Sequence, residues 1–213
     1  MPPTPRLTEL LSVASPALGA PDPALPAWVP AGLAPLWAQR NGFVAFFSAL
    51  HVFPAGPHPA GPHPDGLEAV AAVLDEHFGA LADGHVAFAQ DLFGTLFTWH
   101  ADGVSTFDPE TADSEPLADS LEGWAAELLD EPEGLVGSAF AFDWQERHGA
   151  LRDGERLVPL LPFVLDGEWE DANLEPRPTL LSLRERAALA RVISGLPDGA
   201  EVEWPLPGTR EDG

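Results

Sequence analysis

The segment "AQDLFGTLFTWHADGVSTFDPET", residues 89–111, decides the fold class of this chain. Phe97 and Trp99 alternate with Thr98 and His100, and this two-residue period is that of a strand with two different faces. The "ADG" that follows supplies the positive φ angles of a tight hairpin turn, and "DPET" predicts a second turn. The segment therefore predicts antiparallel strands joined by turns. Strands and turns account for its polar residues without an active site.

Amphipathic helices are predicted on both sides of these strands. "PDGLEAVAAVLDEHFG" and "SLRERAALARVISG" each carry an apolar stripe at helical spacing, and each has a predicted capping box, Asp65 with Glu68 and Ser182 with Glu185. "ADSLEGWAAELLDEPEG" and "GLVGSAFAFDWQERHG" are predicted helices as well. "FVAFFSALHVF" fits either a buried strand or a buried helix, and "DGAEVEW" predicts a last short strand.

The order of the elements is helices, strands, helices and strands, which favours an α+β fold. We expect a single domain with a mostly antiparallel central β-sheet flanked by helices. Residues 1–29 are predicted to form a short helix and a Pro-rich extension, with Thr4 as N-cap and Pro5 at the first helical position. Residues 30–206 are then the α+β domain, and residues 207–213 a flexible tail.

The charge balance restricts the partners that this chain can bind. It has 213 residues, with 34 acids against 10 basic residues and a formal net charge of −24. Nucleic acid phosphates are bound by clustered Lys and Arg, so this balance argues against a nucleic acid partner. It fits either a solvated acidic surface or a protein partner whose surface is basic.

The sequence predicts a cytoplasmic protein with no membrane contact. No apolar run approaches the ~18 residues that a membrane-spanning helix needs. Near the N-terminus, Thr8 and Glu9 interrupt the apolar stretch that a signal peptide would carry.

Signatures of catalysis, cofactor binding and metal binding are absent from the sequence. It contains no Cys, which excludes disulfides, thiolate zinc sites and a cysteine nucleophile. The duplicated "PAGPH" places His58 and His63 in a Pro/Gly loop, which does not fix a metal-binding geometry. "DWQERH" brings Asp143, Glu146 and His148 close in sequence, yet a helix would turn His148 away from Glu146. We therefore expect no catalytic residue, no cofactor and no metal, with a hydrolase of the "DWQERH" region as the weakest alternative.

Several weak motifs, taken in their order and spacing, resemble the SUKH superfamily, a group named partly for a yeast cell-wall assembly regulator. "PAGLAPLWAQRNG" is similar to the "LPxxLxxLWxxxNG" opening of that superfamily. The "DPET" turn and the "LADSLEGW" helix are similar to its central meander, and "LPFVLDGEWEDANLEP" and "LPDGAEVEW" resemble the ends of one bacterial branch. The resemblance spans roughly residues 30–204. The "PAGPH" duplication and the N-terminal extension depart from the pattern.

The resemblance implies a single α+β domain that binds proteins and performs no chemistry. Bacterial members are commonly immunity proteins, which neutralise toxins, and eukaryotic relatives imply the alternative of a regulatory scaffold. Because toxin nucleases are often basic, an acidic inhibitor would suit such a toxin domain, which it would block by occlusion. The oligomeric state stays open.

Two acidic loops are the predicted partner-binding face, and Trp169 lies among the charges of the second loop as an exposed interface residue. A solvated acidic loop is the alternative interpretation. The predicted partner-binding residues are Asp108, Glu110, Asp113, Glu115, Asp166, Glu168, Trp169, Glu170 and Asp171.

Overall fold

The computed structural model describes residues 5–58, 61–62, 65–101, 103–197 and 199–204. Its helices are α1 (Arg6–Ser12), α2 (Ala34–Gln39), α3 (Leu67–Val73), α4 (Leu121–Asp130), α5 (Pro132–Val136), α6 (Ser138–His148) and α7 (Thr179–Ile193). Its strands are β1 (Phe43–Ala45), β2 (Leu50–Val52), β3 (Pro57–His58), β4 (Gly61–Pro62), β5 (Val86–Gln90), β6 (Leu96–His100), β7 (Gly103–Phe107), β8 (Ser114–Ala118), β9 (Glu155–Pro159) and β10 (Leu174–Pro178). Within these residues no helix is long and apolar enough to cross a membrane.

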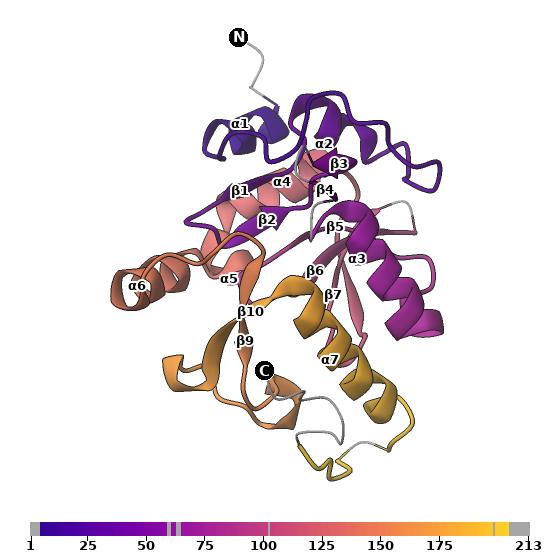
Figure 1. The fold of residues 1–213 in the computed structure, drawn as a ribbon, viewed down its shortest axis with the longest axis vertical. Helices are drawn as coiled ribbons and strands as arrows, with labels where there is room; N and C mark the ends of the chain where they lie inside the picture. The colour runs from indigo at the N-terminus through magenta and orange to yellow at the C-terminus, as the bar shows by residue number, and fades with distance from the viewer. Residues whose placement is uncertain (1–4, 59–60, 63–64, 102, 198, 205–213) are drawn as a thin grey trace.

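The centre of the fold is an antiparallel sheet. Six strands of the described chain follow the order β1-β2-β5-β6-β7-β8, and each neighbouring pair is antiparallel. The predicted hairpin lies between β6 and β7, where His100 pairs with Gly103. Helices flank the sheet (Figure 1), and the predicted α+β fold is confirmed.

Two neighbouring residues of the hairpin show how the sheet is covered on both faces. Phe97 of β6 pairs with Thr106 of β7, so these two side chains lie on the same face of the sheet. Phe107 follows Thr106 in β7 and therefore points to the opposite face. Phe97 packs edge-to-face on Trp124 of α4, at 5.7 Å between ring centroids. Phe107 packs on Phe78, at 5.5 Å, at the end of the π-helical segment that continues α3. Helix α4 therefore covers one face, and α3 with its extension covers the other.

Helix α1 belongs to the same hydrophobic core as the sheet. Leu7, Leu10 and Leu11 are buried in that core, and α1 packs along α4. Arg6 forms ion pairs with Glu9 and with Asp130 at the end of α4. Thr4, the predicted N-cap, lies outside the described residues, and Pro5 occupies the N-cap position instead of the first helical position.

The Pro-rich connector after α1 is held by the end of α2. The Arg40 guanidinium donates to the carbonyls of Leu11, at 2.8 Å, and Ser15, at 2.8 Å. The Asn41 amide donates to the carbonyl of Ala20, at 2.7 Å, and exchanges two hydrogen bonds with the backbone of Ala55. The "RNG" stop after α2 thus has a second role, because its side chains fix the path of the N-terminal segment.

Both predicted capping boxes are wrong, because the acids have tertiary partners. Helix α3 begins after Gly66 without a side-chain cap, and the Glu68 carboxylate accepts from the backbone N–H of Gly56, at 3.0 Å. Helix α7 begins at Thr179, so Ser182 lies inside it. The acid of that predicted box, Glu185, pairs with Arg177 at 3.3 Å.

Three further segments differ from the predicted elements. "FVAFFSALHVF" forms the two strands β1 and β2, and three of the four residues between them, Phe46, Phe47 and Ser48, have positive φ. "GLVGSAFAFDWQERHG" does not form one helix, because Gly137, at φ +68°, separates α5 from α6. The final "DGAEVEW" forms no strand in its described residues, 199–204.

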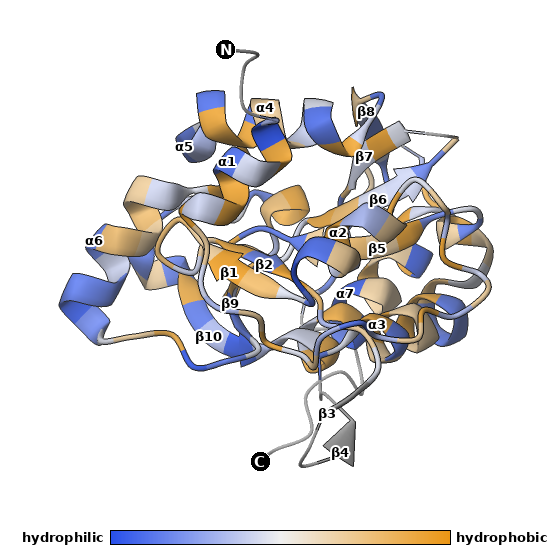
Figure 2. Ribbon diagram, turned by 90° about the horizontal axis from the view of Figure 1, so that it is seen from above, coloured by the Kyte–Doolittle hydropathy of each residue, from blue (hydrophilic) through white to orange (hydrophobic). Residues whose placement is uncertain are grey.

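A second, two-stranded antiparallel sheet, β9 with β10, lies against the start of α7. Backbone hydrogen bonds from Leu157 to Leu92 and from Thr179 to Gly154 hold this hairpin to the body of the molecule. Seen from above and coloured by hydropathy, β1, β2 and β5 are largely hydrophobic while the last turn of α6 is hydrophilic (Figure 2). The loop that connects β9 and β10 carries the second group of predicted acids, Asp166 to Asp171.

Replacement of Gly42 by Ala should destabilise the fold, whereas the same change at Gly134 should not. Gly42 has φ +68°, and an added Cβ would lie 2.7 Å from the backbone of Pro54. We expect Gly42→Ala to lower the free energy of unfolding by roughly 2 kcal/mol or more. Gly134 lies in α5 with no atom near its added Cβ, so Gly134→Ala should stabilise by up to about 1 kcal/mol. Urea unfolding measures both, and equal effects would contradict this account of Gly42.

Candidate functional site

The loop between β9 and β10, residues 160–173, is held in one conformation by its own residues. The Asn173 side chain accepts from Leu161 N–H, at 2.9 Å, and donates to the carbonyls of Leu161 and Glu168, at 3.0 Å each. The Leu160 N–H donates to the backbone carbonyl of Asn173, at 2.7 Å. Two 3₁₀ turns, Phe163–Leu165 and Asp171–Asn173, complete the loop. It is therefore folded back on itself, although it carries no long element.

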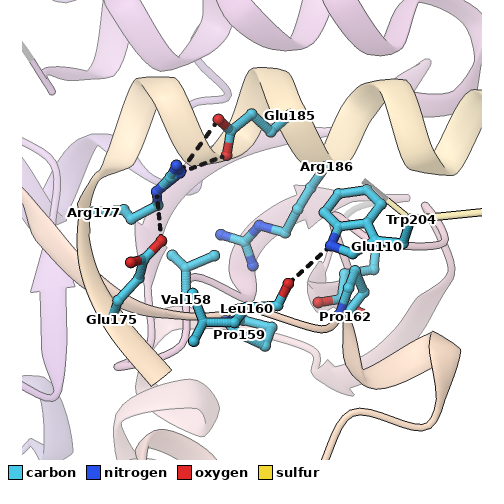
Figure 3. A pocket seen from close by; sticks show the side chains of 10 residues that line it. All are labelled: Glu110, Val158, Pro159, Leu160, Pro162, Glu175, Arg177, Glu185, Arg186 and Trp204. Atoms are coloured by element: carbon cyan, nitrogen blue, oxygen red, sulfur yellow. Dashed lines mark hydrogen bonds and ion pairs between the residues drawn. The ribbon is translucent and has the colours of Figure 1, made fainter. Parts of the chain in front are cut away.

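Three other parts of the chain also hold this 160–173 loop. The Glu110 carboxylate, from the turn after β7, accepts from Val164 N–H at 3.0 Å. The Trp204 indole N–H donates to the Leu160 carbonyl at 2.8 Å (Figure 3). At the far end of the loop, Asp171 accepts from Arg147 and His148 of α6, at 2.7 and 2.9 Å. The surface that the loop presents is thus already ordered before any partner arrives.

Trp169 is the most exposed aromatic group of this loop. Its side chain is 60% exposed, although one face of the indole is stacked on Phe163, at 3.6 Å between centroids and 7° between planes. Phe93, from the β5–β6 turn, meets it edge-to-face at 4.9 Å. Leu161 and Val164 of the same loop are also about 40% exposed. The loop therefore exposes an apolar surface to solvent, and contacts with Phe163 and Phe93 hold the Trp169 side chain in place.

The structure brings the two predicted acidic segments together. Asp113 and Asp166 line one hollow, which is also lined by the end of α7 and by residues from the segments 194–197 and 199–202. The exposed acids of the two segments are Asp113, Glu115, Asp166, Glu168 and Glu170. We call these five acids together with Trp169 the acidic face. Sequence separation hid their proximity, since the turn and the loop are about fifty residues apart.

Three of the predicted partner-binding acids have internal roles instead. Glu110 is 2% exposed, so it lies beneath the acidic face and not on it. Asp108 accepts from the Glu110 N–H at 2.8 Å, which shapes the turn. Asp171 is half-buried, and hydrogen bonding from His148, with Arg147 and Trp144 beside it, holds its pKa below the ordinary value of an Asp. These three carboxylates position the face, and the five exposed acids form it.

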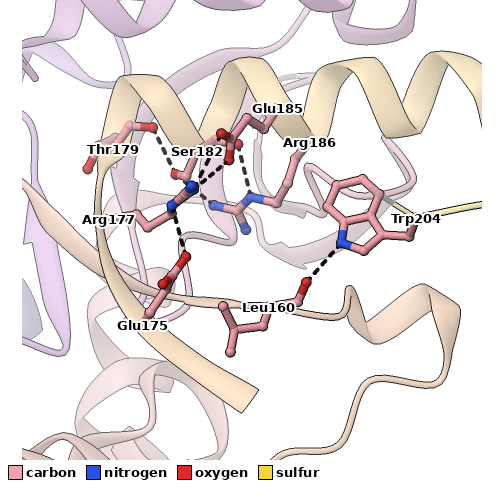
Figure 4. Close-up of polar contacts among 8 residues, drawn as sticks. All are labelled: Leu160, Glu175, Arg177, Thr179, Ser182, Glu185, Arg186 and Trp204. Atoms are coloured by element: carbon pink, nitrogen blue, oxygen red, sulfur yellow. Dashed lines mark hydrogen bonds and ion pairs between the residues drawn. The ribbon is translucent and has the colours of Figure 1, made fainter. Parts of the chain in front are cut away.

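A buried group of charges, Asp91, Glu110 and Arg186, lies under the loop. Arg186 of α7 is 5% exposed, and its guanidinium donates to the carbonyl of Phe93 at 2.9 Å and to the Ser182 hydroxyl at 3.3 Å (Figure 4). The carboxylates that interact electrostatically with it include Glu110 and Asp91. We call these three residues the Arg186 cluster.

The cavity beside the Arg186 cluster is too small for a ligand. Its volume is about 20 Å³, and Glu110, Arg186, Pro162 and Trp204 are among its walls (Figure 3). A volume near ~15–30 Å³ holds about one water molecule. At one side of the cavity Arg177 lies between Glu175, at 3.2 Å, and Glu185, at 3.3 Å (Figure 4). This part of the molecule is therefore structural.

Burial shifts the pKa values within the Arg186 cluster. It raises the pKa of Asp91 to about 6, although the N–H groups of Thr95 and Phe93 and the charge of Arg186 oppose the shift. Burial also raises the pKa of Glu110, against the hydrogen bond from Val164 and the charge of Arg186. The pKa of Arg186 is lowered by burial. The cluster thus holds one cation between two carboxyl groups that both resist ionisation.

The "DWQERH" region does not assemble a hydrolytic site. The His148 ring is stacked on Trp144 and donates to Asp171, and within the described chain no Ser or Thr hydroxyl is bonded to it. Asp143 and Glu146 are exposed. Among the described residues no group of three His, Cys, Asp or Glu side chains could hold a metal ion. The contacts of His148 serve to hold the 160–173 loop against α6.

A second polar hollow is lined by His51, Asp65 and Arg156, and sequence reasoning missed the place of Arg156 beside the other two. His51 Nδ1 lies 3.7 Å from Asp65 Oδ2, beyond the ~3.2 Å of an acid–base pair in hydrogen-bond contact. The Gln90 amide contacts His51 at 3.1 Å and donates to Thr179 at 2.8 Å. These contacts join β2, β5 and the start of α7, so the hollow is explained as a structural junction.

Comparison with known proteins supports the fold alone. No known protein family matches the sequence, and no curated protein matches it. Among solved structures, the chain is similar to the crystal structure of Atu4351 from Agrobacterium tumefaciens, with a TM-score of 0.52 and 12% identity over 83% of this chain and 86% of that one. At this identity the likeness shows a shared α+β fold. The resemblance to the SUKH superfamily stays a prediction.

Asp91→Asn should flatten the pH dependence of stability. The folded-state pKa of Asp91, about 6, exceeds the unfolded value of 3.8, so burying the ionised group costs stability above about pH 6 and nothing below about pH 4. Relative to the wild type, the variant should gain up to about 3 kcal/mol between about pH 4 and pH 7.5. Urea unfolding at both pH values measures this. Exposed Asp143→Asn is the control, and an unchanged pH dependence in Asp91→Asn would contradict the assignment.

Arg186→Met should destabilise the protein far more than Arg177→Met. Removal of the buried guanidinium leaves Glu110 and Asp91 without their shared cation, at a cost of about 3–5 kcal/mol. Arg177 is partly exposed to water between its two glutamates, and losing it should cost about 0–1 kcal/mol. The two variants remove the same charge and are compared by urea unfolding. Similar losses would show that Arg186 has no special role in the cluster.

Proposed function

We propose that this protein is a non-enzymatic protein-binding domain, an immunity protein that neutralises a basic toxin domain in the cytoplasm by occlusion. One observation carries the proposal. The 160–173 loop is held by Glu110, Asp171, Asn173 and Trp204, and yet its outer surface exposes Trp169 among acids. The resemblance to the SUKH superfamily supports the same conclusion, and no cofactor or metal enters it.

A preordered surface supports binding for a thermodynamic reason. Ordering a mobile loop on association would cost free energy, and a loop already held by its own protein avoids most of that cost. Trp is enriched among the residues that dominate binding energy, and such residues lie inside a polar rim. Trp169, Leu161 and Val164 are the apolar residues here, and the five acids of the acidic face are the rim.

The negative charge of the acidic face is the reason for proposing a basic partner. Asp113, Asp166 and Glu170 are exposed, and among the described residues no ion pair within the chain neutralises them. Their field attracts a basic surface and accelerates its association, an effect that salt screens. A basic toxin domain docked here would have its own surface covered, which blocks access of its substrate.

Capture of the partner at two salt concentrations tests the proposal. The full chain is used as bait in extracts of the source cells, with mass spectrometry as the readout at about 50 mM and about 500 mM salt. We expect one basic partner, encoded beside this chain and lost at high salt. Several unrelated partners would instead favour the alternative of a regulatory scaffold, and the absence of a partner at either salt concentration would contradict the proposal.

Variants of the acidic face should then distinguish the acids, which accelerate association with the partner, from Trp169, which contacts the partner in the complex. Asp166→Asn, Glu168→Gln and Glu170→Gln combined should lower the association rate about 10-fold or more with little change in dissociation. Trp169→Ala should instead raise the dissociation rate, by a factor of about 30 if it is a hot spot. Asp75→Asn, Asp83→Asn and Glu127→Gln combined are the charge-matched control on another surface. Equal effects of the two triple variants would contradict the assigned face.

A further inference from the structure

A groove beside Trp169 combines aromatic walls with carboxylates. Its aromatic lining is Phe93, Phe140 and Trp169, and Asp91 and Glu133 also line it. The Phe93 ring contacts both of the others, at 5.6 Å from Phe140 and 4.9 Å from Trp169 between ring centroids. We call this set of five residues the aromatic groove.

The aromatic groove is ordered without a ligand. Asp91 is 8% exposed, and its Oδ1 accepts from the N–H groups of Phe93 and Thr95 at 2.9 and 2.8 Å. The Glu133 carboxylate accepts from the N–H of Ala139 and from the Ser138 hydroxyl, which fixes it between α5 and α6. The Trp169 ring is held by its stack on Phe163. Walls and carboxylates therefore come from three separate segments, each fixed by its own contacts.

The chemistry of the aromatic groove suits a cation. Ring faces attract cations, and rings combined with carboxylates form the usual lining of sites for charged nitrogen groups. The groove has a volume of about 270 Å³, just below the ~300–1,000 Å³ of pockets that take whole drug-sized ligands. This size fits one side chain better than a free metabolite.

We propose that the aromatic groove receives an arginine side chain of the protein partner, an inference that rests on the proposed function. Arginine suits these walls better than lysine, because its planar guanidinium stacks on aromatic rings and donates in a fork to a carboxylate. The guanidinium would stack against Trp169 or Phe140 and donate to Glu133. Two exposed acids, Glu168 and Glu170, flank Trp169 in the sequence, and their charge favours the approach of a cation.

The buried arginines of the protein itself do not bind Glu133, the carboxylate proposed to accept from the partner's arginine. Asp91 interacts electrostatically with the buried cations Arg186 and Arg156, and both guanidinium groups donate to other acceptors. Arg186 donates to Phe93 and Ser182, and Arg156 donates to the Ser48 carbonyl at 2.7 Å. Neither donates to Glu133, whose partners are backbone and hydroxyl groups.

A small-molecule probe tests the groove without any partner. The ¹⁵N-labelled full chain is titrated with N-acetyl-arginine amide, and the indole N–H signal of Trp169, assigned with Trp169→Phe, is followed by NMR. We expect a saturable shift at millimolar to tens of millimolar probe, and binding at least ~10-fold weaker for N-acetyl-citrulline amide, the neutral analogue of the same shape. No saturable shift of Trp169, or equal binding of citrulline or lysine amides, would overturn the proposal.

Groove variants locate the binding and keep the test independent of folding. Glu133→Gln combined with Asp91→Asn should weaken arginine binding at least ~5-fold, since both amides can still accept the backbone hydrogen bonds. Asp75→Asn combined with Glu127→Gln is the matched control and should bind as the wild type does. The NMR spectrum of each variant reports whether the fold is retained. Unchanged affinity in the folded groove variant would overturn the assignment.

The two proposals fail in different ways. Saturable arginine binding with no protein captured from the source cells would support the groove and contradict the immunity function. A salt-sensitive basic partner that still binds Glu133→Gln with unchanged affinity, and binds after each of its interface arginines is replaced, would support the function and overturn the groove.

Discussion

The buried guanidinium of Arg186 is the interaction on which the rest of this structure depends. It lies on α7, donates to the carbonyl of Phe93 in the β5–β6 turn, and balances carboxylates of that turn and of the turn after β7. Glu110, one of these carboxylates, in turn holds the 160–173 loop through Val164. A helix, two turns of the central sheet and the outer loop therefore share a single cation. Because a charge buried without its partner is costly, these segments must assemble together.

This arrangement explains how the acidic face stays ordered despite its charge. Exposed acids repel one another and weaken a loop that is held only by surface contacts. Here the loop is fixed from below by Glu110, Asn173 and Asp171, none of which is fully exposed. In these two segments, some carboxylates hold the loop in place and other carboxylates are exposed to solvent. The outer acids and Trp169 can vary in chemistry without removing the contacts that shape the loop.

Local pattern predicted the central strands and several of the helices, but it did not predict tertiary partners. The strands around Phe97 follow from short-range periodicity and the "DPET" turn from its residue types, and the structure contains both. Ser182 and Glu185 have the spacing of a capping box, yet Glu185 pairs with Arg177, a contact that only the fold creates. Glu110 belongs to a turn that looks fully solvated, and its burial depends on Val164, 54 residues later. Trp169 was predicted to be exposed because an aromatic residue among charges has no local explanation, and it is 60% exposed.

The distribution of cations gives the molecule its electrostatic character. Most described arginines have a hydrogen-bond or ion-pair partner within the chain: Arg6, Arg40, Arg147, Arg152, Arg156, Arg177, Arg186 and Arg191. These arginines thus bind acceptors of their own chain, while the five acids of the acidic face have no cationic partner within the described chain. Their mutual repulsion lowers the stability of the free protein, and the same field draws in a basic partner. Added salt should therefore raise the stability of the free protein, because it screens the repulsion among the acids, and weaken the binding of a basic partner, because it screens the attraction.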